Sequence, residues 1–320
     1  MMKSTREAFD RITKAATDGA RKSIGTTWFL LRIMVPVSLA VAILGWSGVL
    51  GWIAAIIAPL MKPIGLPGEA ALACLSGALL NNYSAIAVMS SLSLDMRQVT
   101  IIAVMCLVCH NLLVETAVMK KTGSSAVRMA TLRLGSAYVL AWILNRILPA
   151  SLSARQFSSA VTGNKPPFMV MLAGWTGSTA SLAVKIIIIV AVIMIAQKLL
   201  EEFSVMNYLS RLFAPLMIVL GLPRSASFLW LVINGVGYAY GAGIIVAEIE
   251  AGKMKPQESD LFNHHAAITH SLLEDTILYA AISVPVFWLL VPRILMSMAV
   301  VWIERMRRHV FRRSFRVGTV

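Results

Sequence analysis

The chain has 320 residues, of which 58% are apolar and 14% are charged. This composition excludes an ordinary soluble domain and indicates an all-α polytopic transmembrane protein, because several apolar runs approach the roughly 20 residues that a helix needs to cross a bilayer. The net charge of +14 does not predict nucleic-acid binding. Basic residues gather in the first 22 residues and from Arg305 to Arg316, beside apolar runs, as expected of cytoplasmic flanks that touch anionic lipid.

Apolar segments, breakers and charge divide the chain in order. A basic segment, 1–25, precedes a first series of helices at about 26–46, 49–61, 68–91, 98–119 and 126–148. A Ser- and Pro-containing linker, 150–168, is followed by a second series at about 183–200, 204–217, 224–247, 261–282 and 285–303, and by a basic tail, 304–320. We therefore expect two units, repeat 1 at 26–149 and repeat 2 at 169–303.

An internal repeat supports this division. Two short motifs recur at an offset of 156 residues, Ala58–Met61 as Ala214–Met217 and Gly65–Pro67 as Gly221–Pro223. Further along the offset is 160, and it pairs His110 with His270, Arg133 with Arg293 and Trp142 with Trp302. Shared membrane composition would produce coincident Leu and Val, but not His, Arg and Trp in step.

The charges of two equivalent loops predict that the units are inverted. Residues 117–132 hold Lys120, Lys121 and Arg128, whereas residues 277–292 hold no charge. The first loop is therefore expected in the cytoplasm and the second outside. With five segments in each unit, both termini are expected in the cytoplasm. Inverted repeats typically form substrate sites near the bilayer midplane, at broken helices.

Polar residues in the third segment of each unit predict such broken helices. The short helix 49–61 is about 20 Å long and cannot cross the bilayer. Its neighbour contains Asn81, Asn82 and Tyr83, and the second copy contains Asn234 and Tyr238 within a glycine-rich run. Unwound backbone at that depth is tolerated when it lines a wet cavity. The alternative is close helix packing by small residues.

Ionisable residues inside the apolar segments are the candidate functional groups. Glu115 and Arg133 are 18 residues apart, and Asp275 and Arg293 repeat that spacing. We predict two structural ion pairs that hold the helical hairpins together, because arginine stays protonated and is a poor proton carrier.

Two histidines and one further carboxylate remain. Glu274 lies four residues after His270, on the same helix face, and His110 is the equivalent of His270. This set is suited to proton coupling or to a metal ion, and the alternative is hydrogen bonding between helices. Cys106 and Cys109 precede His110 in a haem-attachment pattern, but they lie inside an apolar segment, so they are at most soft metal ligands.

We expect no cofactor and no enzymatic activity. The chain has no nucleotide-binding P-loop, no Gly-x-Ser-x-Gly elbow and no His-Glu-x-x-His motif.

The chain resembles the Gate proteins, named for the nucleoside-recognition domain of concentrative nucleoside transporters, the membrane part of ferrous iron transport protein B, and spore maturation proteins A and B. The resemblance covers about residues 26–303. It is carried by the two Gly-Leu-Pro elements, by Asn81-Asn82-Tyr83 and Asn234-Gly235, and by the His-x-Leu-Leu segments at 110 and 270. It implies a transporter-like membrane domain whose cargo stays open.

These observations together predict a transporter or permease of a small polar solute or ion in the bacterial inner membrane. The expected site combines Asn81, Asn82, Tyr83, His110, Asn234, Tyr238, His270 and Glu274 at the midplane, with His110, His270 and Glu274 as candidate metal ligands. One alternative is a divalent-metal permease. Another is a non-transporting membrane assembly or scaffold partner. Lipid is an expected partner, nucleic acid is not, and a homo-oligomer or a membrane partner protein stays open.

Overall fold

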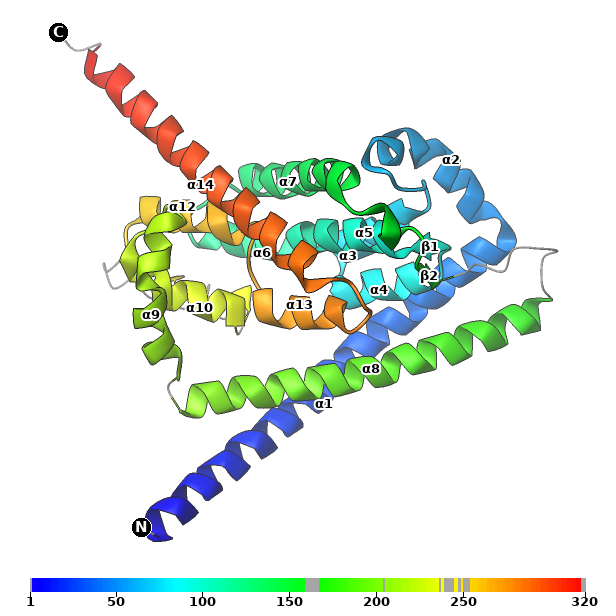
Figure 1. Ribbon diagram of the computed structural model, residues 1–320, viewed down its shortest axis with the longest axis horizontal. Coiled ribbons are helices and arrows are strands. Elements are labelled where there is room, and N and C mark those ends of the chain that lie inside the picture. Colours follow the sequence, from blue (N-terminus) through cyan, green and yellow to red (C-terminus); the bar gives the residue numbers. More distant parts are fainter. Residues whose placement is uncertain are drawn as a thin grey trace.

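The computed structural model describes residues 2–158, 167–203, 205–235, 237–238, 245–246, 249 and 254–317. Within these ranges the protein is almost entirely helical (Figure 1), and its one sheet pairs β1 (Leu94–Asp95) with β2 (Gln156–Ser158) in antiparallel fashion. Four helical stretches are long and apolar enough to cross a membrane: Met96–Lys121, Ala126–Ile147, Phe168–Leu200 and Val286–Val310. The protein is therefore an all-α membrane protein, as the composition predicts.

A short 3-10 turn, η2 (Ala150–Leu152), separates the helices of the two predicted units along the chain. Those of the first unit are α1 (Met2–Ser47), α2 (Val49–Met61), η1 (Lys62–Ile64), α3 (Ala70–Leu79), α4 (Asn82–Ser90), α5 (Met96–Cys109), α6 (Leu112–Lys121) and α7 (Ala126–Ile147). After η2, those of the second unit are α8 (Phe168–Glu202), α9 (Val205–Val219), η3 (Arg224–Ala226), α10 (Ser227–Gly235), α12 (Pro256–Ala266), α13 (Leu272–Ala280) and α14 (Val286–Val317).

Helix α5 forms the centre of the core. Every residue from Val99 to Cys109 is buried, so this helix has no polar face and is surrounded by protein on all sides. It lies between α3, α4, α7 and α14, in the middle of the molecule in Figure 1. Because α14 belongs to the second unit, the core is shared between the two halves of the chain.

The basic N-terminal residues are part of a long helix and not a separate segment. Helix α1 runs alongside α8 (Figure 1), and Arg11 Nε donates to Glu202 Oε1 at 2.7 Å. A Cβ atom on Gly19 would lie 2.7 Å from the Cα atom of Ile195. Glycine therefore allows the two helix backbones to approach each other closely.

The two Gly-Leu-Pro motifs end the short helices in the same way. Gly65 and Gly221 have φ angles of 73° and 76°. In the first copy the Leu66 amide donates to the Met61 carbonyl, and in the second the Leu222 amide makes the equivalent bond. This is the left-handed closure that ends many helices and favours glycine.

Alanine at Gly65 should destabilise the protein more than alanine at Gly48. Both glycines have positive φ, but nothing lies within 4 Å of a Cβ at Gly48, whereas a Cβ at Gly65 would overlap the Asn145 carboxamide. Arg97 donates to that carboxamide at 2.9 Å and prevents it from moving away. We expect Gly48→Ala to cost about 1 kcal/mol and Gly65→Ala about 3 kcal/mol. Thermal unfolding in detergent measures both, and equal shifts would contradict the clash.

The fourth segment of each unit, predicted to be a continuous helix, is broken. Helix α5 is separated from α6 at Asn111, which has φ 48°, and α12 is separated from α13 by a short loop that ends at Ser271, with φ 51°. The Asn111 amide donates to the Gly77 carbonyl at 3.0 Å, and the Ser271 amide donates to the Ile233 carbonyl at 2.8 Å. Each break is therefore held by a helix of the preceding segment of its own unit, α3 in the first and α10 in the second. The predicted break in the third segment is present between α3 and α4, and much of its equivalent after α10 lies outside the described residues.

Candidate functional site

The two helix breaks place two histidines against each other. His110 and His270 each directly precede the residue with positive φ, and their ring centroids are 4.9 Å apart. Both side chains are buried, with exposed fractions of 7% and 0%. The sequence repeat thus corresponds to a real contact between the two units, at the interior ends of their broken helices.

Hydrogen bonds to the backbone determine how these rings present their nitrogen atoms. His110 Nδ1 lies 3.0 Å from the Cys106 carbonyl oxygen, and His270 Nδ1 lies 2.8 Å from that of Ala266. A carbonyl oxygen only accepts, so Nδ1 carries the hydrogen in each ring. In the neutral form each Nε2 is therefore a free acceptor.

Both units also contribute a carboxylate to this centre. Glu115 and Asp275 occupy equivalent positions, 160 residues apart. Glu115 Oε2 lies 3.0 Å from His270 Nε2, Glu115 Oε1 lies 3.4 Å from His110 Nε2, and Asp275 Oδ2 lies 3.7 Å from the same nitrogen. Carboxylate and imidazole acceptors that face one another repel unless a cation lies between them. Besides Arg133, which pairs with Glu115, the centre can therefore accommodate a cation, either a proton or a metal ion.

Two buried arginines fix the broken ends. Arg133 Nε and Nη2 donate to the carbonyls of Val108 and His110 at 2.8 and 2.7 Å. Arg293 makes the equivalent bonds, to the carbonyls of residues 268 and 270, at 3.3 and 2.9 Å. These carbonyls have lost their helical partners at the breaks, so each guanidinium acts as a cap supplied from the next helix.

The expected ion pairs differ between the two units. Arg133 Nη2 lies 2.7 Å from Glu115 Oε2, as an ion pair requires. Asp275 and Arg293, both described, do not form the expected pair, because Asp275 Oδ1 accepts from Asn82 Nδ2 at 2.9 Å and its other oxygen faces His110.

Residues from the third segment of the first unit surround the acidic side of the centre. Besides its bond to Asp275, Asn82 accepts from the Tyr279 hydroxyl at 3.2 Å. The Tyr83 hydroxyl donates to Glu274 Oε1 at 3.2 Å. Glu274 is not in the group of potential metal ligands at this centre, which consists of His110, His270 and Glu115 and has ligand atoms within 4.8 Å of one another.

Three other predicted site residues have hydrogen-bond partners outside this group. Asn81 Oδ1 accepts from the Ser84 amide at 2.9 Å, so it is an N-cap of α4. Asn234 Nδ2 donates to the carbonyl of residue 230 at 2.8 Å. The ring of Tyr238 stands edge-on to His270, with centroids 5.8 Å apart, and its hydroxyl donates to Asn263 at 2.9 Å. Tyr238 alone of the three contacts a ring of the centre.

The cysteines do not belong to the candidate site. Cys109 Sγ donates to the Met105 carbonyl at 3.0 Å, and Cys106 Sγ lies 3.9 Å from the Ala73 carbonyl. All three cysteines are free thiols, and none is in a group of potential metal ligands among the described residues.

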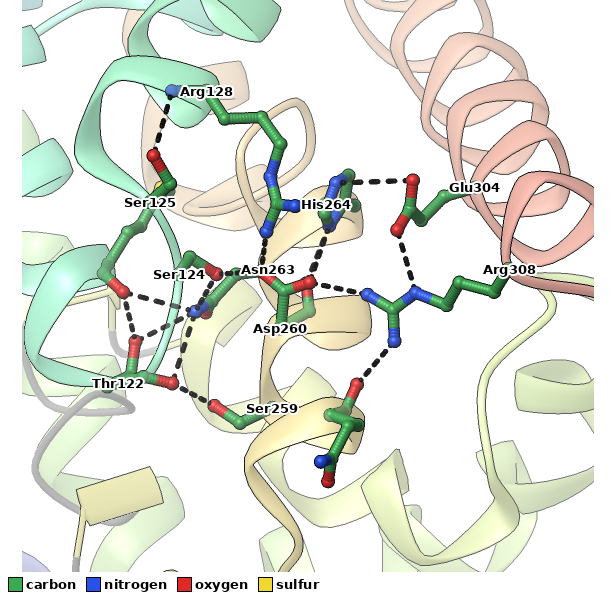
Figure 2. A network of polar contacts seen from close by, with 12 residues as sticks. Thr122, Ser124, Ser125, Arg128, Ser259, Asp260, Asn263, His264, Glu304 and Arg308 are labelled. Carbon is green, nitrogen blue, oxygen red and sulfur yellow. Dashed lines mark hydrogen bonds and ion pairs between the residues drawn. The ribbon is translucent and has the colours of Figure 1, made fainter. Parts of the chain in front are cut away.

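A second polar cluster, which the sequence analysis missed, joins the units at another place (Figure 2). Asp260 of α12 accepts from Arg128 of α7 through one oxygen and from Arg308 of α14 through the other. Ser124 donates to Asp260 at 2.6 Å, and Arg308 Nε donates to Glu304 at 2.7 Å. We call these five residues the polar clamp. The spacing of four between Glu304 and Arg308 was visible in the sequence, but nothing there connected it to Asp260.

The polar clamp breaks the symmetry of the repeats. At the offset of 160, Asp260 and Glu304 correspond to Thr100 and Leu144 of the first unit, which carry no charge. Its carboxylates already have arginine partners. This cluster therefore connects α7 of the first unit to α12 and α14 of the second. Asp260 and Glu304, with His264, lie close enough together to hold a metal ion, but their arginine partners make this a poor candidate site.

Comparisons with known proteins agree with the resemblance described above. The family model Gate, described as nucleoside recognition, matches residues 27–126. The membrane protein YvoD of Bacillus subtilis (strain 168) is 30% identical over 288 residues, which cover 88% of this chain and 92% of that protein. No solved structure matches the chain. With its membrane-spanning helices and its similarity to YvoD over nearly the full length, the chain belongs to the Gate, or nucleoside-recognition, family of membrane proteins.

Proposed function

We propose that the protein is a transporter of a small ion, with its binding site at the junction of the two broken helices. The observation that carries the proposal is the meeting of His110 and Glu115 of one unit with His270 and Asp275 of the other, all buried. Ionisable groups inside a membrane domain are costly and are typical of ion pathways. A site made by matched elements of two repeats is also typical of secondary transporters.

The dimensions of the centre favour an ion over a larger solute. Its four side chains contact one another at 3.0 to 3.7 Å, and the carboxylate of Asp275 is further held by Asn82. A nucleoside would have to separate all of these contacts, whereas a proton or a metal ion fits between them. Family membership supports a transporter-like domain, and the side chains support the choice of cargo.

The polar clamp supplies one of the two closures that alternating access requires. It connects Ser124, in the loop before α7, and Arg128, in the first turn of α7, to α12 and α14. Both residues belong to the basic stretch 117–132 that is expected in the cytoplasm. We infer that the described conformation is closed on the cytoplasmic side. In this scheme the units are inverted in the inner membrane, both termini are cytoplasmic, and the clamp opens when the units rock apart.

Flux through lipid vesicles tests the proposal. The purified protein is reconstituted into sealed vesicles, and uptake of protons, Zn²⁺, Mn²⁺ and labelled uridine is measured. We expect uptake of a cation that Glu115→Gln abolishes. Glu69→Gln is the matched control, because Glu69 belongs to the same unit but lies outside the centre.

Two outcomes would contradict this reading. Uridine uptake would overturn the choice of an ion. Absence of all flux from vesicles that hold folded protein would overturn transport and favour a non-transporting membrane partner.

A further inference from the structure

We propose that His110, His270 and Glu115 bind one divalent transition-metal ion, with Asp275 close enough to be a fourth ligand. The proposal rests on the proposed function in one respect, since the ion would be the transported cargo. Binding itself is a separate property that can be measured without transport.

The distances fit coordination of a small ion. Metal–nitrogen and metal–oxygen bonds of about 2.0 to 2.2 Å place neighbouring ligand atoms roughly 3 to 3.6 Å apart in tetrahedral or octahedral sites. Glu115 carboxylate oxygens lie 3.0 and 3.4 Å from the two Nε2 atoms. Asp275 Oδ2, 3.7 Å from His110 Nε2, needs only a small shift to join.

Three of these atoms are buried without a hydrogen-bond partner: Glu115 Oε2, His270 Nε2 and Asp275 Oδ2. Glu115 Oε2 has an ion pair with Arg133, whereas His270 and Asp275, which are 0% and 5% exposed, have no arginine on these two atoms among the described residues. A buried acceptor without a partner costs about 1 to 3 kcal/mol. Because the rest of each side chain is held by hydrogen bonds, the free atoms stay directed toward Glu115 and His110. A bound cation removes this cost.

Both rings are oriented as metal-binding histidines usually are. A ligating histidine generally donates its second nitrogen to a carbonyl or a carboxylate, which fixes the tautomer and the ring plane. His110 and His270 both do so through Nδ1, to carbonyls in the helices that precede them, α5 and α12. The geometry is therefore organised before any ion enters.

The donor set selects the class of ion. Two imidazole nitrogens and a carboxylate suit Zn²⁺, Fe²⁺, Co²⁺ and Mn²⁺, whereas Mg²⁺ and Ca²⁺ prefer oxygen ligands alone. Arg133 forms an ion pair with one oxygen of the Glu115 carboxylate, with Nη2 at 2.7 Å from Oε2, and so competes with a bound ion for that oxygen. This competition weakens the hold on the ion, which suits a site that must also release it.

Cobalt binding to the purified full chain tests the site. The protein is stripped with chelator in detergent and dialysed against Co²⁺, and bound metal and the visible absorption are measured. We expect one ion per chain and the ligand-field bands of a nitrogen–oxygen site. Both should be lost in the His110→Ala, His270→Ala double variant and in Glu115→Gln, which preserves the side-chain shape.

His265→Ala is the matched control. His265 is buried in α12, the helix that precedes His270. Its Nε2 already accepts from Trp230 at 2.8 Å, so it should not bind the ion. Folded wild-type protein that binds no Co²⁺, or Co²⁺ binding that survives in folded Glu115→Gln and in the double variant, would overturn the site.

The two proposals fail separately. Stoichiometric Co²⁺ binding without flux of any cation would support the site and overturn transport. Flux of protons without Co²⁺ binding would support transport and overturn the metal site.

Discussion

Replacing Arg133 by methionine should prevent most of the protein molecules from reaching the folded state in the membrane. The guanidinium is 0% exposed, pairs with Glu115 and caps two carbonyls at the break after α5. Methionine removes all of these contacts and leaves Glu115 buried without a partner of fixed charge. Loss of one member of a buried ion pair costs about 3 to 5 kcal/mol. The free energy of unfolding of a typical protein is only about 5 to 15 kcal/mol, so this loss is a large share of it.

Arg293→Met is the matched control because it isolates the ion pair. Arg293 is equally buried and makes the same two bonds to carbonyls, but no carboxylate among the described residues pairs with it. We expect a cost of about 1 to 3 kcal/mol from the lost hydrogen bonds alone. Monodisperse yield after size-exclusion chromatography and the unfolding temperature in detergent measure both variants. Equal losses would show that the pair with Glu115 contributes no more than the caps, and a well-folded Arg133→Met with altered ion binding would give Arg133 a role in transport.

The repeat in the sequence identified the two histidines of the centre as equivalent residues. The offset of 160 pairs His110 with His270, and their rings are in contact in the structure. Apolar runs and breakers predicted some segment boundaries, since the predicted 49–61 is α2 and the predicted 126–148 ends one residue beyond α7. They placed two helix starts wrongly, because α1 begins at Met2 instead of 26 and α8 begins at Phe168 instead of 183. Helix boundaries depend on local sequence, and the equivalence of the histidines is visible because the motif occurs in both repeats.

The breaks at the histidines could not be predicted from the same pattern. Residues 98–119 are a nearly continuous apolar run without glycine or proline, which favours an unbroken helix. The break requires Asn111 at positive φ, and it is stabilised by Arg133, which follows 22 residues later. Strain of this kind persists only where tertiary contacts compensate for it, so it is invisible in local sequence.

The false symmetry of the ion pairs has a similar cause. At the offset of 156, Asn82 corresponds to Tyr238. Asn82 donates to Asp275 of the other unit. Tyr238 donates to Asn263 instead of Glu115, and Glu115 pairs with Arg133. Equal spacing along the chain predicted equal pairs, but the partner from the opposite unit decided each one.

Replacing Asp260 by asparagine should loosen the closure between the units. Asp260 accepts from Arg128 of the first unit and from Arg308 of the second, and it is the acidic link between them. An amide cannot neutralise both cations, so they will repel each other across the interface. Since both guanidinium groups are partly exposed, we expect a cost of about 1 to 3 kcal/mol, below that of a fully buried pair.

Hydrogen–deuterium exchange measures this opening where it occurs. Exchange of the amides in residues 119–128 and 256–266 should rise roughly tenfold to a hundredfold in Asp260→Asn, because each 1.4 kcal/mol changes an opening equilibrium about tenfold. Glu258→Gln is the matched control, since Glu258 lies in the same helix, is exposed and accepts from the backbone of Lys255 only. If exchange in the two variants is equal, the clamp does not hold the units together. Faster exchange confined to these segments, with the histidine centre still protected, would mean that the polar clamp opens without dismantling the site, as alternating access requires.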